Sequence, residues 1–152
     1  MTDPISFDST TPRFALPRLF AGQAQKEIFV NEAHARIDAI VHCAVEATQA
    51  APPATPVEGQ SWLVGGSPTG DWAGQAGKIA SRQGGQWLFT PARDGMKVLD
   101  RATGQERRYH GGWKGPAAPS APSGGATVDA EARAAIAELV AKLREAGVFP
   151  DA

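Results

Sequence analysis

The sequence has no excess of charge, and it lacks the apolar segments that mark export or membrane insertion. It has 15 Lys and Arg residues against 16 Asp and Glu residues, which leaves a net charge of -1. A chain so close to neutrality has no overall field to attract nucleic acid or an anionic membrane. The N-terminus has no basic region followed by an apolar run, and no segment approaches the ~20 apolar residues of a membrane span. We therefore expect no nucleic acid partner, no membrane insertion and no signal-dependent export.

Cysteine and histidine are too few, and too widely spaced, for a disulfide or a metal site. The single cysteine, Cys43, has no partner for an internal disulfide and lies among apolar residues, where a thiol behaves as a small hydrophobe. His34 and His42 are about two helical turns apart, which is too far to hold one ion from a single helix face. We expect no metal and no cofactor.

Catalytic motifs are also missing. The sequence has no nucleophile elbow, phosphate loop, dinucleotide-binding fingerprint or paired CxxC motif. A cell-wall or capsule hydrolase would need two carboxylates facing one cleft. The pattern brings no two acids together, so we favour a noncatalytic protein and keep the hydrolase as an alternative. The acids available to it in the region of short strands, residues 57–114, are Asp71, Asp94, Asp100 and Glu106.

Glycine and proline are abundant, with 17 and 12 residues, and they divide the chain into segments. Pro4, Pro12 and Pro17 predict an extended arm over residues 1–17, because proline removes a backbone donor and disfavours helix before it. Apolar residues then recur at three- and four-residue steps as far as Ala44 and Val45, which predicts an amphipathic helix within residues 18–50. A helix break near the capping residue Asn31 is an alternative.

Residues 57–114 predict a small β module. Short apolar or aromatic runs alternate there with Gly-rich turns, which indicates an antiparallel meander of five or six strands. Gly84-Gly85 fits a two-residue hairpin between KIASRQ and QWLFT, since glycine tolerates the positive φ angles that such a turn requires. Together with the flanking helices, the module predicts an α+β fold.

The C-terminal segments predict a tether and a short helix. Residues 115–126 have the Gly, Pro and Ser composition of a flexible linker. Residues 127–149 regain helical periodicity, with Thr127 or Asp129 as the N-cap and Gly147 as the stop. A helix this short needs a packing partner, so we expect it either to pack on its own domain or to join copies of the chain in a trimer or pentamer. The apolar contacts expected for this role are Ile136, Leu139 and Leu143.

The four tryptophans all fall in the β module. Trp62 and Trp87 lie in apolar runs and are expected in the core. Trp72 and Trp113 lie in Gly-rich turns, where we favour a structural role. They are also the candidate glycan contacts, which leaves a carbohydrate-binding module as an alternative function.

Three blocks of the sequence resemble a known family. The run AGQAQKE-x-x-x-NEA from Ala21 to Ala33 is followed by P-x-x-G-x-x-W-L-V and PTG-x-WAG. These blocks, within about Pro12 to Trp113, resemble domains found in prophages and gene transfer agents of alphaproteobacteria. The resemblance implies a virion protein, typically a tail fibre, head spike or adaptor, with no known catalysis. Such a protein would be made in the cytoplasm and leave the cell in a particle released by lysis.

The resemblance also suggests a role for the polar cluster that heads the helix. In an oligomer or a docking site, amides and charges can bond across chains and fix the register. The alternative is that these side chains only cover a solvated helix start. Other virion proteins and a host surface polysaccharide are the remaining expected partners. The expected interchain contacts are Gln23, Gln25, Lys26, Asn31 and Glu32.

Overall fold

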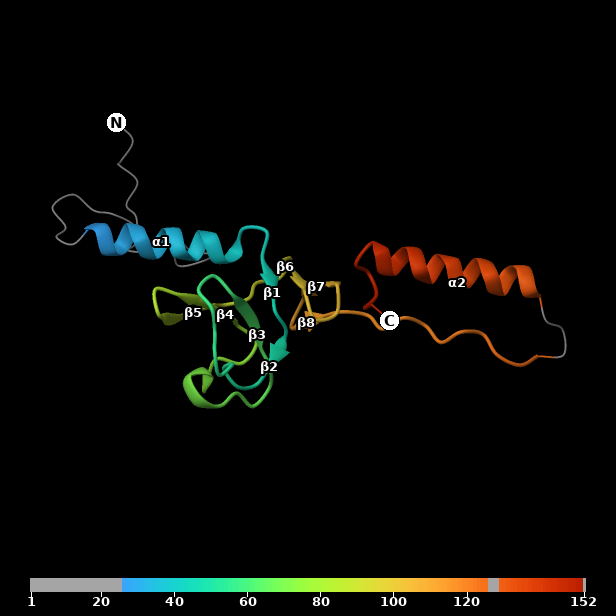
Figure 1. The fold of residues 1–152 in the computed structure, drawn as a ribbon, viewed down its shortest axis with the longest axis horizontal. Helices are drawn as coiled ribbons and strands as arrows, with labels where there is room; N and C mark the ends of the chain where they lie inside the picture. The colour runs from blue at the N-terminus through green and yellow to red at the C-terminus, as the bar shows by residue number, and fades with distance from the viewer. Residues whose placement is uncertain (1–25, 126–128, 152) are drawn as a thin grey trace, which may run out of the picture.

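A helix, a pair of small sheets and a second helix follow one another along the chain. The computed structural model describes residues 26–125 and 129–151, and the side chains from residue 29 onward (Figure 1). Asn31 lies inside a continuous α1, so the predicted break near it was wrong. The elements are α1 (Lys26–Ile40), β1 (Ala44–Val45), β2 (Thr48–Gln49), β3 (Ser61–Val64), the 3-10 helix η1 (Gly70–Trp72), β4 (Ile79–Gln83), β5 (Gln86–Thr90), β6 (Lys97–Asp100), β7 (Gln105–Tyr109), β8 (Trp113–Lys114) and α2 (Ala130–Glu145).

The helix α1 ends earlier than the periodicity predicts. It ends at Ile40, and His42 then takes a left-handed backbone conformation with φ 49°, which turns the chain out of the helix. Ala44 and Val45, expected on the helix face, form β1 instead. Val45 is fully buried between the sheets, so packing against strands outweighs the local helical pattern.

The strand-rich middle is confirmed, but its topology is not a meander. The strands form two four-stranded sheets, in the orders β1-β6-β7-β8 and β2-β3-β4-β5. Each sheet contains one parallel pair, β1 with β6 and β2 with β3. The segment that carries β1 and β2 joins the sheets, because Val45 accepts a bond from Arg101 while Glu46 donates to Ser61 of β3.

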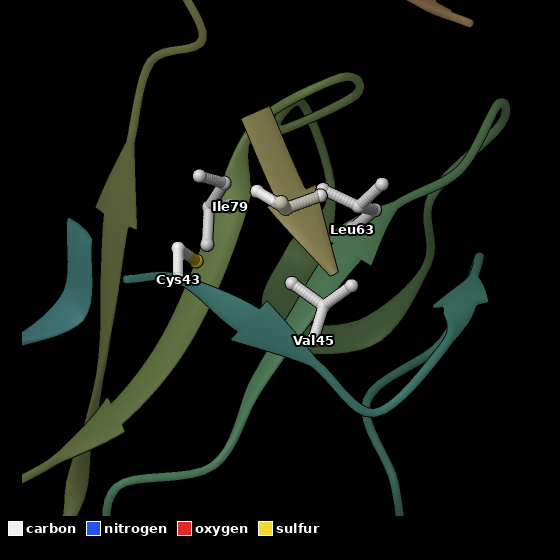
Figure 2. Close-up of a cluster of buried hydrophobic side chains, with 5 residues drawn as sticks. Cys43, Val45, Leu63 and Ile79 are labelled. Atoms are coloured by element: carbon white, nitrogen blue, oxygen red, sulfur yellow. The ribbon is translucent and has the colours of Figure 1, made fainter. Parts of the chain in front are cut away.

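The main core lies between the two sheets. Strand β3 is buried along its whole length, and its side chains alternate between two clusters. Leu63 joins the cluster between the sheets, while Trp62 and Val64 face the opposite side. Figure 2 shows four members of the first cluster pointing toward one another. The full set of buried residues in that cluster is Cys43, Val45, Leu63, Ile79 and Val98.

The second cluster is aromatic. The ring of Trp72, carried by η1, packs edge to face on Trp87 with centroids 5.1 Å apart, and Trp62 lies 6.3 Å from it. A small sheet has few aliphatic side chains with which to form a core, and three indole rings fill that core here. The sheet β2-β3-β4-β5 is therefore covered on both faces.

The predicted C-terminal helix is confirmed, and so are its end signals. Asp129 accepts a bond from the backbone of Ala132 at 2.8 Å, as an N-cap does. At the other end Gly147 has φ 69°, and Val148 donates to Leu143 in a Schellman-type stop. The linker after β8 leads away from the β module, and α2 runs back so that its C-terminal end lies beside the module (Figure 1).

Candidate assembly surfaces

Three of the four candidate acids of the β module lie beside basic side chains. Asp100 is buried and accepts from Arg107 at 2.7 Å. Glu106 pairs with Lys97 at 2.8 Å on the surface, and Asp94 lies 3.3 Å from the ring of His110. The remaining candidate, Asp71, is exposed in η1. These carboxylates therefore form ion pairs, lie beside a histidine or face solvent. Their arrangement gives no support to the hydrolase alternative.

The two candidate glycan contacts lie in different environments. Trp72 has 0% exposure, so its ring offers no face to a sugar. Trp113 is half-buried, its indole N–H donates to the carbonyl of Gly77 at 3.0 Å, and its ring meets Tyr109 at 5.2 Å. Both rings therefore pack against other parts of the chain. The half-buried ring of Trp87 also packs, against the cluster that contains Trp72.

The structure describes only part of the predicted polar cluster. Gln23 and Gln25 lie outside the described residues, as does the side chain of Lys26. Glu32 accepts two bonds from Arg36 of the same helix, at 2.9 and 3.1 Å, while Asn31 is exposed. A helical ion pair one turn apart accounts for Glu32 within a single chain and leaves Asn31 available for other contacts.

A groove separates the middle of α1 from the β4–β5 hairpin. Its volume is ≈ 460 Å³, and the amide of Gln83 donates to Asp38 of the helix at 2.9 Å, which holds its two walls together. Asn31 and Glu32 lie in this groove, beside the strand β5. Nothing in the sequence pattern indicates that these two elements meet. The lining residues are Asn31, Glu32, Ala35, Gln83, Gly84, Gln86, Trp87 and Leu88.

The helix α2 forms a second surface. None of its residues is buried, and Ile136 and Leu139 are 44% and 59% exposed. Leu143 is half-buried near the C-terminal end. Along one side the helix meets the linker, where Arg133 donates to the carbonyls of Pro122 and Gly124. The apolar stripe of α2, which consists of the expected contacts Ile136, Leu139 and Leu143, therefore remains largely in contact with solvent.

The base of α2 is fixed to the β module by backbone bonds. Glu106 donates to the carbonyl of Gly147, and Asp151 donates to that of Thr103, both at 2.7 Å. The buried amide of Gln105 completes the anchor by donating to Val148, and also to Pro116 at the start of the linker. Sequence reasoning missed Gln105, because a polar residue in a short strand gives no signal of its contacts.

A groove of larger volume lies next to that anchor. It measures ≈ 580 Å³ and is lined by Ile40, Leu99 and Gly147, among others. Cys43 lies at its wall, and burial raises the pKa of the Cys43 thiol from 9.0 to about 11. A thiol held in its protonated form is a poor nucleophile. Cys43 therefore acts as a packing residue, as the sequence predicts.

Across residues 26–125 and 129–151, no three His, Cys, Asp or Glu side chains come together as metal ligands. No helix in this described part is long and apolar enough to cross a membrane.

No curated protein matches the chain. A family model described as "Protein of unknown function (DUF2793)" matches residues 30–114, which cover α1 from Val30 and all eight strands. The linker and α2 lie beyond the match. Since the match covers more than half of the 152 residues, the chain belongs to this family.

Proposed function

We propose that this protein is a noncatalytic structural component of a phage-like particle, either a gene transfer agent or a prophage. Its place on the particle is a tail fibre, a head spike or an adaptor, and it takes part in attachment to the host cell surface. The observation that carries the proposal is α2, a 16-residue helix with no buried residue that is fixed at its base to the β module. A helix of this length needs a partner surface to be stable in water.

Assembly of several copies supplies that surface. Joining the exposed stripes of Ile136 and Leu139 would bury apolar side chains that one copy leaves in water. Several β modules would then be presented together, and weak contacts to a host polysaccharide would add up through avidity. The resemblance of the sequence blocks to prophage and gene transfer agent domains supports a particle as the site of assembly.

The test is whether the chain travels with particles. An epitope-tagged chain is produced in its native host, and the lysate is separated on a density gradient. We expect the tag in the fraction that holds nuclease-protected DNA, and we expect antibody to decorate one defined position on the particles. A tag that remains only with free protein at the top of the gradient would contradict the proposal.

A further inference from the structure

The strand β5 forms an open edge of its sheet. It is the last strand in the order β2-β3-β4-β5, and it is five residues long. The other terminal strands, β1, β2 and β8, have two residues each. Short edge strands are a common protection against unwanted pairing, so β5 is the exception among the described edges.

The backbone of β5 directs unpaired groups outward at Trp87 and Phe89. Arg82 lies opposite Trp87 in the β4–β5 register, and both backbone groups of Arg82 bond toward β3, to Gly59 and Gln60. In an antiparallel pair such a position has no bonds across the pair, so the N–H and C=O of Trp87 point away from β4. The same alternation turns Phe89 outward, and no described residue bonds to either backbone.

The strand β5 itself carries no charge, proline or bulge that would protect the edge. Gln86–Thr90 contains no charged residue and no proline, and five consecutive pairs with β4 leave no room for a bulge. Charges, prolines and bulges are the features that normally stop an edge strand from pairing with another chain. Only Pro91, directly after the strand, limits how far pairing could extend.

The outward groups are self-complementary. We propose that β5 pairs antiparallel with β5 of a second copy of this chain, about a twofold axis at Leu88. Trp87 of each copy then lies opposite Phe89 of the other, and every outward N–H meets an outward C=O. The same patch serves both copies, as a twofold interface requires, and no like charges meet across it. The pair joins two four-stranded sheets into one continuous sheet.

This contact suggests a role for Asn31 and Glu32 of the polar cluster. Asn31 and Glu32 line the groove beside β5, so they lie next to the second strand once it pairs. The inference rests on the proposed function, because a particle holds copies of the chain close together. The contact itself lies on β5 and not on α2. A twofold contact gives even-numbered assemblies, so a trimer or pentamer built through α2 would pair with a second one.

Amide hydrogen exchange on the full-length chain tests the pairing residue by residue. The amides of Trp87 and Phe89 are expected to gain at least about tenfold protection as concentration rises and the copies associate. Leu88 is the internal control, because its amide points toward β4 and is protected at every concentration. Rapid exchange of Trp87 and Phe89 at all concentrations would overturn the proposal. Slow exchange in a dilute monomer would overturn it too, since the chain itself would then cover the edge.

Disulfide trapping tests the register. In the Leu88→Cys variant the two thiols face each other at a non-bonded pair, with Cα atoms ~4.5 Å apart, within disulfide range. In the Gln86→Cys control they are four residues apart along the strands, roughly 14 Å, which is too far. We expect mild oxidation to link only the Leu88→Cys chain into dimers. Cys43 stays out of the reaction because it is buried. Equal linking of both variants, or of neither, would overturn the register.

The two proposals fail in different ways. If the chain travels with particles but the amides of Trp87 and Phe89 exchange freely, the proposed function stands and the β5 contact is wrong. If the chain pairs through β5 but is never found with particles, the β5 contact stands and the proposed function is wrong.

Discussion

Asp100 is a buried carboxylate, and its hydrogen-bond partners determine how much it contributes to the free energy of unfolding. It is 1% exposed, accepts from Arg107 at 2.7 Å, and also accepts from the backbone of Ala102 at 3.1 Å. The Asp100→Ala change leaves Arg107, a quarter exposed, without its counter-charge. We predict a loss of about 2–3 kcal/mol in the free energy of unfolding, measured in urea, since a broken buried pair is costly and partial exposure softens the loss.

The matched control is a surface pair on the neighbouring position of β7. Glu106 pairs with Lys97, and both side chains are about half exposed. The Glu106→Ala change is expected to cost less than about 0.5 kcal/mol, because solvent screens such pairs. Equal losses in the two variants would show that burial of Asp100 has no energetic consequence.

Cys43 gives a pH-dependent prediction. Burial raises its pKa from 9.0 to about 11 in the folded chain, so the unfolded chain ionises first as the pH rises. The contribution of Cys43 to stability is therefore complete below pH 9 and is lost as the pH rises through 11. We predict that the free energy of unfolding falls more steeply over this range in the native chain than in Cys43→Ala. Parallel curves for the two proteins would contradict the assignment.

The position of single residues was partly predictable. Burial of Cys43 follows from its apolar neighbours, and the cap at Asp129 follows from its place before a helical pattern. Burial of Trp72 does not follow from its Gly-rich surroundings. It depends on contacts with Trp62 and Trp87, which lie 10 and 15 positions away and are brought together only by the sheet.

The β4–β5 hairpin depends on the backbone of its turn. Gly84 and Gly85 have φ of 59° and 74°, as the sequence predicts, and a Cβ on Gly84 would meet no atom within 4 Å. Substitution there therefore tests backbone conformation alone. We predict that Gly84→Val costs about 1–2 kcal/mol in thermal unfolding, while Gly84→Asn is nearly neutral because asparagine tolerates this conformation. Equal costs for both would point to a lost contact in place of backbone strain.

Elements were predictable where a local pattern extended over several residues. The helix α2 and the hairpin have such patterns, and both are present. The strands β1 and β2 have two residues each, too few to show alternation, and they pair in parallel with strands distant in sequence. The two-sheet arrangement depends on them, which is why the sequence predicted a meander instead.

In the whole molecule, the two proposed contacts lie on separate elements. The edge of β5 is in the β module, and the apolar stripe is on α2, beyond the linker. The sequence located the stripe by its periodicity. It could not locate the β5 edge, because whether a strand is an edge depends on the order of strands in the sheet.

Light scattering of the full-length chain over a range of concentrations tests the central claim, that the protein acts as an assembly of copies. We predict a mass of several copies, and a smaller assembly for Ile136→Glu combined with Leu139→Glu, which places charge on the exposed stripe. Ala134→Glu, two positions from Ile136 and exposed on another face, is the control and should keep the original mass. A mass of 15.9 kDa at every concentration would contradict the account.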